Sequence, residues 1–332
     1  MKRLFLLSLI IGTLFTGCTK KSKVVDYKVV MTSEDRSIST SDDIVDFSFV
    51  DENIGYALGY DGYSVKLHKT INGGLNWIEV GAPNPSFNID YDDIHSMLFV
   101  DEFNGMLLIN QRLYRTLNGG MSWIELTNQF GFALDVIFSC QGEDGNIYAF
   151  ETNNSNGVCE IYKLEMNGYG YTIVATYPTL FTDFDTGHYH DNHVVLLSRN
   201  FNLFEHMVYR INLNNFSGEI LEVTGSNYEI PNDAMHTSQG TIFARKSGLV
   251  HFFNKQAYFY NNNDYYSIDQ VNDYFVAVRD NSISTNYIGT WEEALNVEGT
   301  SFIEKFRRVR KIDDSHFYLS GTNGLFYKST FE

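Results

Sequence analysis

The sequence predicts an all-β fold built from repeated units. Three observations support this prediction: short runs of alternating apolar and polar residues recur along the chain, turns containing glycine and asparagine separate them, and no long stretch has the apolar spacing of a helix. The composition is that of a folded globular protein, with 43% hydrophobic and 20% charged residues among 332.

The clearest repeat relates residues 42–80 to residues 92–126. Equivalent positions are offset by 50 in the first part of the repeat and by 46 in the last part, so the second copy lacks four residues. The gap falls where the first copy has a glycine-containing stretch, residues 59–62. Loops between strands tolerate such changes in length, so we expect a loop at this position.

Each unit is predicted to contain four strands, which in the first copy are residues 46–49, 55–59, 65–70 and 77–80. The first and third strands alternate with period 2, as half-buried strands do, and the second contains small residues that suit a crowded interior. Residues 72–74, Asn-Gly-Gly, predict a tight turn, because Asn and Gly adopt positive φ at low cost. Four antiparallel strands in about 40–50 residues match the size of a β-propeller blade.

Weaker copies of the unit divide the rest of the chain. We expect seven blades, with six as the alternative, near residues 42–88, 89–130, 133–178, 179–224, 227–266, 267–298 and 301–332. The last unit ends before its fourth strand, whereas residues 27–31 offer a spare strand at the other end of the chain. An open sheet edge is a hazard, so we predict that this N-terminal strand closes the ring beside residues 325–329.

Two eight-residue turns, 70–77 and 116–123, resemble the Asp-box (BNR) motif, Ser/Thr-x-Asp-x-Gly-x-x-Trp, with Asn at the position that the motif gives to Asp. The matching residues are Thr70, Asn72, Gly74, Trp77, Thr116, Asn118, Gly120 and Trp123. Residues 42–126 thereby resemble the photosystem II assembly-factor-like repeat within the sialidase-like Asp-box β-propellers. The resemblance implies that the box is structural, with no metal or catalytic role. Members of that family bind other proteins, but fold similarity does not transfer this role.

The first 17 residues have the features of a lipoprotein signal peptide. Lys2 and Arg3 precede a mostly apolar run, residues 4–15, which is too short to span a bilayer. Residues 15–18, Phe-Thr-Gly-Cys, resemble the lipobox of bacterial lipoproteins, although Leu is usual where Phe15 stands. The resemblance implies acylation of Cys18 and cleavage before it. An ordinary secretory signal with an incidental cysteine is the alternative.

The predicted organisation is therefore a signal peptide (1–17), a lipidated tether (18–26) and a single β-propeller domain (27–332). We expect the acylated N-terminal Cys18 to hold the protein on a membrane outside the cytoplasm, at the periplasmic or cell-surface face of the envelope. Removal of Lys2 and Arg3 leaves 22 basic against 41 acidic side chains, a charge of −19. Nucleic acid is excluded as a partner, because binding its phosphates requires a basic face.

His188, His190 and His193 form the densest group of potential metal ligands. The first two share a face of an extended strand, and a transition metal could use all three. The interpretation we favour is a polar surface loop between two strands, so we predict no metal site and no cofactor. Cys140 and Cys159 fall on the first and third strands of one unit, too far apart for a disulfide, and are expected to be buried thiols.

A sialidase-like glycoside hydrolase acting on surface glycans is the enzymatic alternative. Resemblance to sialidases would imply an arginine cluster, a Tyr/Glu nucleophile pair and an acidic proton donor. The tight arginine cluster of this chain is Arg307, Arg308 and Arg310, and the last two share a face of a strand. We favour a solvated or acid-paired strand and assign no catalytic residue. Convergence of acidic and basic groups at one mouth of the central channel would favour the enzyme.

The sequence thus predicts a non-catalytic binding or scaffold protein of the cell envelope, whose ligand is a protein or a glycan. It does not identify the residues that bind this ligand.

Overall fold

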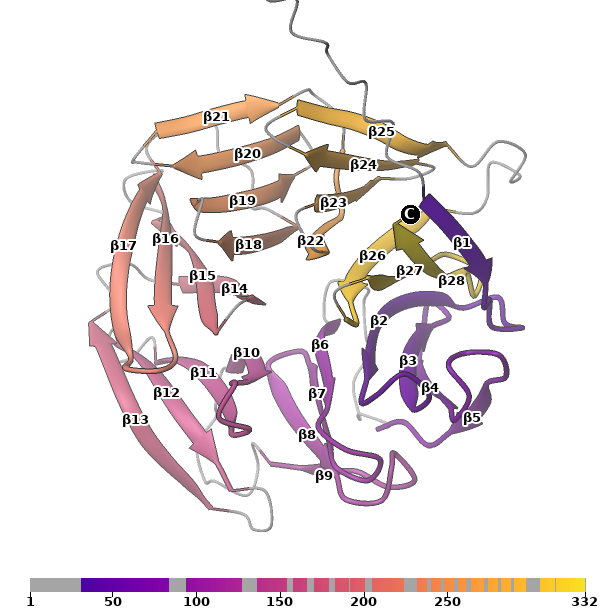
Figure 1. The fold of residues 1–332 in the computed structure, drawn as a ribbon. Helices are drawn as coiled ribbons and strands as arrows, with labels where there is room; N and C mark the ends of the chain where they lie inside the picture. Colours follow the sequence, from indigo (N-terminus) through magenta and orange to yellow (C-terminus); the bar gives the residue numbers. More distant parts are fainter. Residues whose placement is uncertain are drawn as a thin grey trace, which may run out of the picture.

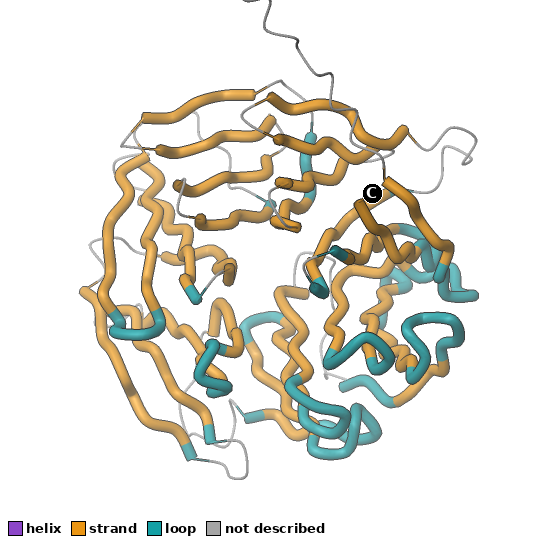
Figure 2. Tube along the Cα trace, viewed as in Figure 1, coloured by secondary structure: helices purple, strands orange, loops and turns teal. Residues whose placement is uncertain are grey.

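The computed structural model describes residues 31–83, 94–126, 136–153, 158–165, 170–178, 183–190, 192–200, 205–223, 232–237, 240–245, 248–253, 256–260, 264–271, 274–279, 282–287, 290–296, 305–313 and 315–331. These residues form strands, turns and loops, and the strands make seven four-stranded antiparallel sheets arranged in a ring (Figures 1 and 2). The predicted all-β propeller with seven blades is confirmed. None of the described residues belongs to a helix that could cross a membrane.

Six blades are each made of four consecutive strands, and every one falls within one predicted unit. Blade 1 contains β2 (Asp43–Phe49), β3 (Gly55–Tyr60), β4 (Val65–Thr70) and β5 (Ile78–Val80). Blade 2 contains β6 (Ile94–Phe99), β7 (Gly105–Ile109), β8 (Arg112–Thr116) and β9 (Ile124–Glu125). Blade 3 contains β10 (Val136–Gln141), β11 (Ile147–Asn153), β12 (Val158–Leu164) and β13 (Tyr171–Pro178). Blade 4 contains β14 (Asp183–His190), β15 (His193–Asn200), β16 (Glu205–Asn212) and β17 (Ser217–Val223).

Blade 5 contains β18 (Asp233–Thr237), β19 (Gly240–Arg245), β20 (Gly248–Phe253) and β21 (Gln256–Tyr260). Blade 6 contains β22 (Ser267–Val271), β23 (Tyr274–Arg279), β24 (Ser282–Tyr287) and β25 (Thr290–Asn296). Blade 7 contains β26 (Phe306–Lys311), β27 (His316–Gly321) and β28 (Phe326–Phe331), and its fourth strand comes from the other end of the chain.

The N-terminal strand β1 (Met31–Asp35) completes blade 7. It pairs antiparallel with β28, from Met31 opposite Phe331 to Asp35 opposite Tyr327. Closure by an N-terminal strand is therefore confirmed, but the strand begins at Met31 and extends four residues beyond the predicted segment 27–31, whose first four residues lie outside the described part. The reason is physical: an outermost strand is exposed along much of its length, so it does not need the apolar run on which the prediction rested.

The first strand of each blade lies innermost, and each of these seven strands contacts the next around the ring axis (Figure 1). Aromatic side chains fill the space between blades 7, 1 and 2. The ring of Tyr56 in blade 1 stacks on Phe99 in blade 2, with centroids 3.5 Å apart, and Tyr318 in blade 7 stacks on Phe49 in blade 1 at 4.1 Å. The Phe99 ring in turn covers Gly105, where an added Cβ would lie 2.6 Å from the ring.

Candidate functional site

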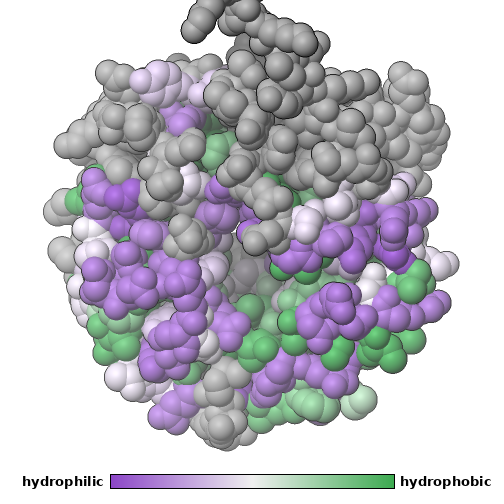
Figure 3. Space-filling model, viewed as in Figure 1, coloured by the Kyte–Doolittle hydropathy of each residue, from purple (hydrophilic) through white to green (hydrophobic). Residues whose placement is uncertain are grey.

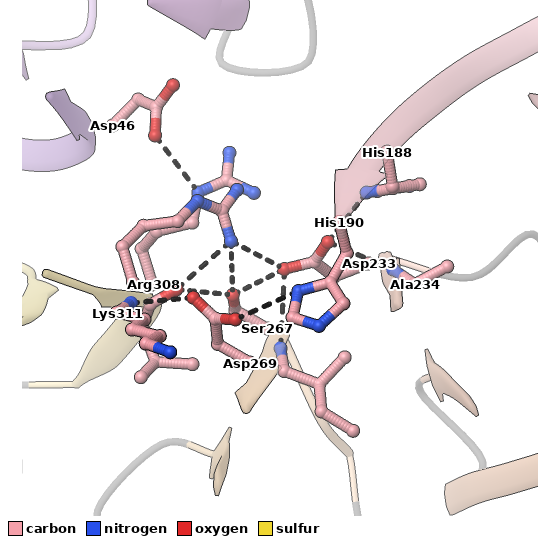
Figure 4. Close-up of polar contacts among 12 residues, drawn as sticks. Asp46, His188, His190, Asp233, Ala234, Ser267, Asp269, Arg308 and Lys311 are labelled. Atoms are coloured by element: carbon pink, nitrogen blue, oxygen red, sulfur yellow. Dashed lines mark hydrogen bonds and ion pairs between the residues drawn. The ribbon is translucent and has the colours of Figure 1, made fainter. Parts of the chain in front are cut away.

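Charged and polar side chains from the innermost strands of five blades converge near the ring axis (Figure 4). This group, which we call the axial cluster, consists of Asp46 (β2), His188 and His190 (β14), Asp233 (β18), Ser267 and Asp269 (β22), and Arg308 and Arg310 (β26). Because these residues are far apart in the chain, only closure of the ring brings them together.

Asp233 is the most connected member and is 2% exposed. Its Oδ1 accepts a hydrogen bond from the Ala234 N–H at 2.9 Å and lies 2.6 Å from His188 Nδ1. Its Oδ2 accepts from Arg310 Nη1 at 3.0 Å and from the Ser267 hydroxyl. Burial alone would raise the pKa of this carboxyl, but the charges of Arg310 and His188 hold the pKa well below its usual range. Asp233 is therefore an anion with both oxygens occupied.

The axial carboxylates also join neighbouring blades through backbone N–H groups. The described residues make three such bonds: Met97 N–H to Asp46 at 2.9 Å, Ile268 N–H to Asp233 at 3.3 Å, and Lys311 N–H to Asp269 at 2.6 Å. In each case the donor belongs to the innermost strand of the next blade. A carboxylate that accepts a backbone N–H satisfies a donor that a ring of separate sheets would otherwise leave unpaired.

The arginine cluster is arranged as its strand spacing predicts. Arg308 and Arg310 face the axial carboxylates: Arg308 Nε lies 3.5 Å from Asp46 Oδ1, and Arg310 is paired with Asp233. Arg307 points to the opposite face, with its guanidinium 4.3 Å from the centre of the Tyr266 ring. Burial would lower the pKa of Arg310, but the surrounding carboxylates raise it above its usual value. The acid-paired interpretation of Arg308 and Arg310 is therefore confirmed.

The histidine group differs from its prediction as a polar surface loop. His188 and His190 lie on β14 and His193 begins β15, and His188 is 8% exposed. His188 is held by Asp233, His190 Nδ1 lies 3.5 Å from Asp269 Oδ1, and His193 Nε2 lies 3.3 Å from the Asn212 amide. The three side chains thus have three different neighbours. Among the described residues, no three His, Cys, Asp or Glu side chains are placed to hold a metal ion.

Two buried nitrogen atoms of the axial cluster have no hydrogen-bond partner among the described residues, His188 Nε2 and Arg308 Nε. The sequence pattern predicted no role for Asp46, Asp233 or Asp269. The sequence offered a signal at Asp46 and Asp269, since each lies within a strand-forming stretch and strands disfavour aspartate.

The two box-like turns adopt the same hydrogen-bonding pattern. Thr70 Oγ1 accepts from the Gly74 N–H at 2.9 Å, and Asn72 Oδ1 accepts from the Asn76 N–H at 2.9 Å. In the second turn Thr116 and Asn118 accept from Gly120 and Ser122 at the same distances. Each tryptophan donates its Nε1–H to the preceding blade, Trp77 to the Arg36 carbonyl and Trp123 to the Gly81 carbonyl, both at 3.0 Å. These contacts serve the turn and the packing between blades.

Cys140 on β10 and Cys159 on β12 are free, buried thiols, as their predicted strand positions require. Burial raises the pKa of the Cys159 thiol to about 12 and raises that of Cys140 as well. Both groups are therefore un-ionised and unreactive at neutral pH. Cys18 lies outside the described residues.

No protein-family model matches the chain, and no curated protein sequence matches it. Solved structures resemble it. The structure of YCF48 bound to a D1 peptide has a TM-score of 0.65 and 13% identity and covers 91% of this chain and 97% of that chain. The extracellular domain of the hybrid two-component system BT4673 from B. thetaiotaomicron has a TM-score of 0.57 and 13% identity, covering 90% of this chain and 39% of that one. The Dos1 propeller has a TM-score of 0.56 and 12% identity, and the match covers 86% of this chain and 77% of that one. Similarity at these identities establishes that the chain has the fold of a β-propeller.

Proposed function

We propose that this chain is an exported, lipid-anchored β-propeller that binds a protein partner at the cell envelope and catalyses no reaction. One observation carries the proposal: the chain matches, over 91% of its length, a propeller whose structure holds a bound peptide. The two propellers also correspond in length, since the match covers 97% of the other chain. Propellers present loops on two faces, and such surfaces suit a protein ligand.

The axial cluster supports a structural role in preference to catalysis. It does bring acidic and basic groups together, the feature expected of a glycoside hydrolase. Such an enzyme, however, needs a carboxylic acid whose pKa is raised so that it holds its proton near neutral pH. The carboxyl groups with altered pKa values in the described part of the chain all have lowered ones; they are Asp61, Asp101, Asp144, Asp233 and Asp313. These five carboxyl groups are ionised at neutral pH and cannot donate a proton there.

The proposed anchor is the diacylglyceryl-modified Cys18. Its support is the order of a charged pair, a short apolar run and the lipobox-like residues 15–18 at the start of the sequence. Cys18 precedes the first described residue, Met31, by 13 positions, which leaves room for a tether between lipid and propeller. Two or more acyl chains give stable attachment to a membrane.

The test expresses the full chain in a bacterial host that acylates lipoproteins, beside a Cys18→Ala variant. Mass spectrometry of the mature N-terminus should find a lipid on Cys18, and the variant should leave the membrane fraction while keeping its circular-dichroism spectrum. Photo-crosslinking in cells, followed by mass spectrometry, should then capture a defined envelope protein. An unmodified Cys18 contradicts the anchor, whereas binding on a glycan array or cleavage of a glycan contradicts the protein-binding role.

A further inference from the structure

The box-like turns expose large apolar side chains. In the first turn Ile71 and Leu75 are 66% and 65% exposed, and at the equivalent positions of the second turn Leu117 and Met121 are 49% and 76% exposed. The turn itself does not require them, because its hydrogen bonds come from the threonine and asparagine side chains. An exposed apolar residue at the same two unspecified positions of both copies therefore points to a use outside the fold.

These side chains belong to one face of two adjacent blades. Phe103, 56% exposed, lies in the turn between β6 and β7, and its carbonyl accepts from the Gly119 N–H at 2.9 Å, next to Leu117. Blade 1 contacts the same turn through Tyr56, whose hydroxyl donates to the Glu102 carbonyl at 2.6 Å. We call Ile71, Leu75, Phe103, Leu117 and Met121 the apolar turn tips. Figure 3 shows hydrophobic residues interspersed with hydrophilic ones over the part of the ring that β2 to β9 form.

The chain enters the propeller at the level of these tips. Met31, the first residue of β1, pairs with Phe331, and Ile78, the first residue of β5, pairs with Lys69 at the equivalent place in blade 1. Blades are related by rotation about the ring axis, so equivalent positions lie at the same height along it. In blade 1 this position directly follows the box-like turn. Met31, the first described residue after Cys18, therefore lies at the face that carries the apolar turn tips.

We propose that this face rests on the lipid bilayer, with the apolar turn tips inserted between the headgroups and the acyl chains. The inference rests on the proposed anchoring of Cys18. Thirteen residues reach at most about 45 Å, so the anchored body stays close to the membrane. The acyl chains on Cys18 hold the protein on the bilayer, and apolar side chains at the interface add to this attachment.

The negative charge of this face indicates which kind of membrane lipid it can contact. Asp51 and Glu52 are exposed in the turn between β2 and β3, which contacts the first box-like turn through a hydrogen bond from the Gly73 N–H to the Asn53 carbonyl at 2.9 Å. The mature chain carries a charge of −19. An anionic surface repels such a face. The occupant is therefore a bilayer surface of zwitterionic lipid.

The test places a polarity-sensitive fluorophore on single cysteines introduced as Leu75→Cys and Met121→Cys in the full, acylated chain, reconstituted in phosphatidylcholine vesicles. The matched control is Tyr63→Cys, because Tyr63 is 88% exposed in the turn between β3 and β4, at the opposite end of blade 1. Labels at 75 and 121 should shift to the blue and gain at least twofold in intensity on reconstitution, and lipids that carry a quencher should quench them. The label at 63 should not respond.

Equal accessibility of all three labels to an aqueous quencher would overturn the inference while leaving the anchor intact, provided that the protein floats with the vesicles. Failure of the acylated protein to float would instead reject the proposed anchor. Vesicles that contain phosphatidylglycerol should give a smaller shift at 75 and 121. Protection of the two sites only when a crosslinked partner protein is present would assign the tips to a protein interface and overturn the inference.

Discussion

Asp233 shows how one buried carboxylate joins four blades. It lies at the start of blade 5 and contacts His188 of blade 4, Ser267 of blade 6 and Arg310 of blade 7. Its ionised form is the one that these neighbours stabilise, as the lowered pKa indicates. Removing the charge would leave the partly buried Arg310 without its main counter-ion.

Replacing this residue, Asp233→Asn, should reduce the free energy of unfolding at pH 7 by about 1.5–3 kcal/mol, the range for hydrogen bonds to charged groups, because the Arg310 side chain left behind is 33% exposed and partly solvated. Urea unfolding followed by circular dichroism measures the change. The control is Asp61→Asn, since Asp61 sits in an exposed turn and its backbone acceptor role survives in the amide. Equal effects of the two substitutions would show that Asp233 does not hold the blades together.

The effect of Asp233→Asn should also depend on pH in one direction. The pKa of Asp233 is lower in the folded state than the value of about 3.9 expected when unfolded, so its contribution is fully present above about pH 4. It is lost as pH falls through the folded pKa. The difference in Tm between wild type and variant should thus be constant from pH 7 to 5 and shrink below pH 4. A Tm difference that grows as pH falls would mean that the pKa of Asp233 is raised, not lowered, in the folded protein.

At the scale of single elements, the box-like turn is the part that the sequence predicted best. Its hydrogen bonds join residues at most four positions apart, so the information is local. The sequence predicted that an N-terminal strand closes the ring, but it placed this strand at residues 27–31 and not at Met31–Asp35. The position was missed because an exposed edge strand such as Ser33–Asp35 has no apolar pattern. The turn at Asp313 repeats the one at Asp51, and in both the carboxylate accepts two backbone N–H groups.

Thr70→Val should cost about 1–3 kcal/mol, because it keeps the side-chain shape but leaves the buried Gly74 N–H without an acceptor. Asn72→Asp should cost little, since a carboxylate can accept the same two hydrogen bonds, from Thr70 and Asn76. Thermal unfolding of the two variants compares them directly. A loss from Asn72→Asp as large as that from Thr70→Val would mean that the amide group itself is required.

At the scale of the whole molecule, the sequence repeat predicts the ring of blades, but it does not predict the axial cluster. Seven units could be counted from the alternation of strands and turns; six contain a whole blade and the last contains three strands of blade 7. The partners of Asp46, Asp233 and Asp269 could not be predicted, because they come from blades more than 30 residues apart that meet only at the axis. For the same reason the histidines suggested a surface loop, although closure of the ring buries His188 against Asp233.

Closure of this ring by the N-terminal strand can be measured with one crosslink. Ser33 and Ser329 are register partners whose hydroxyl oxygens lie 2.8 Å apart. The double variant Ser33→Cys, Ser329→Cys should form a disulfide between these positions, found by mass spectrometry of the unreduced protein, and should have a raised Tm. The control, Glu34→Cys with Ser329→Cys, puts the first thiol on the other face of the strand and should stay reduced. Free thiols at 33 and 329 under oxidising conditions, or equal crosslinking in the control, would contradict the closed ring.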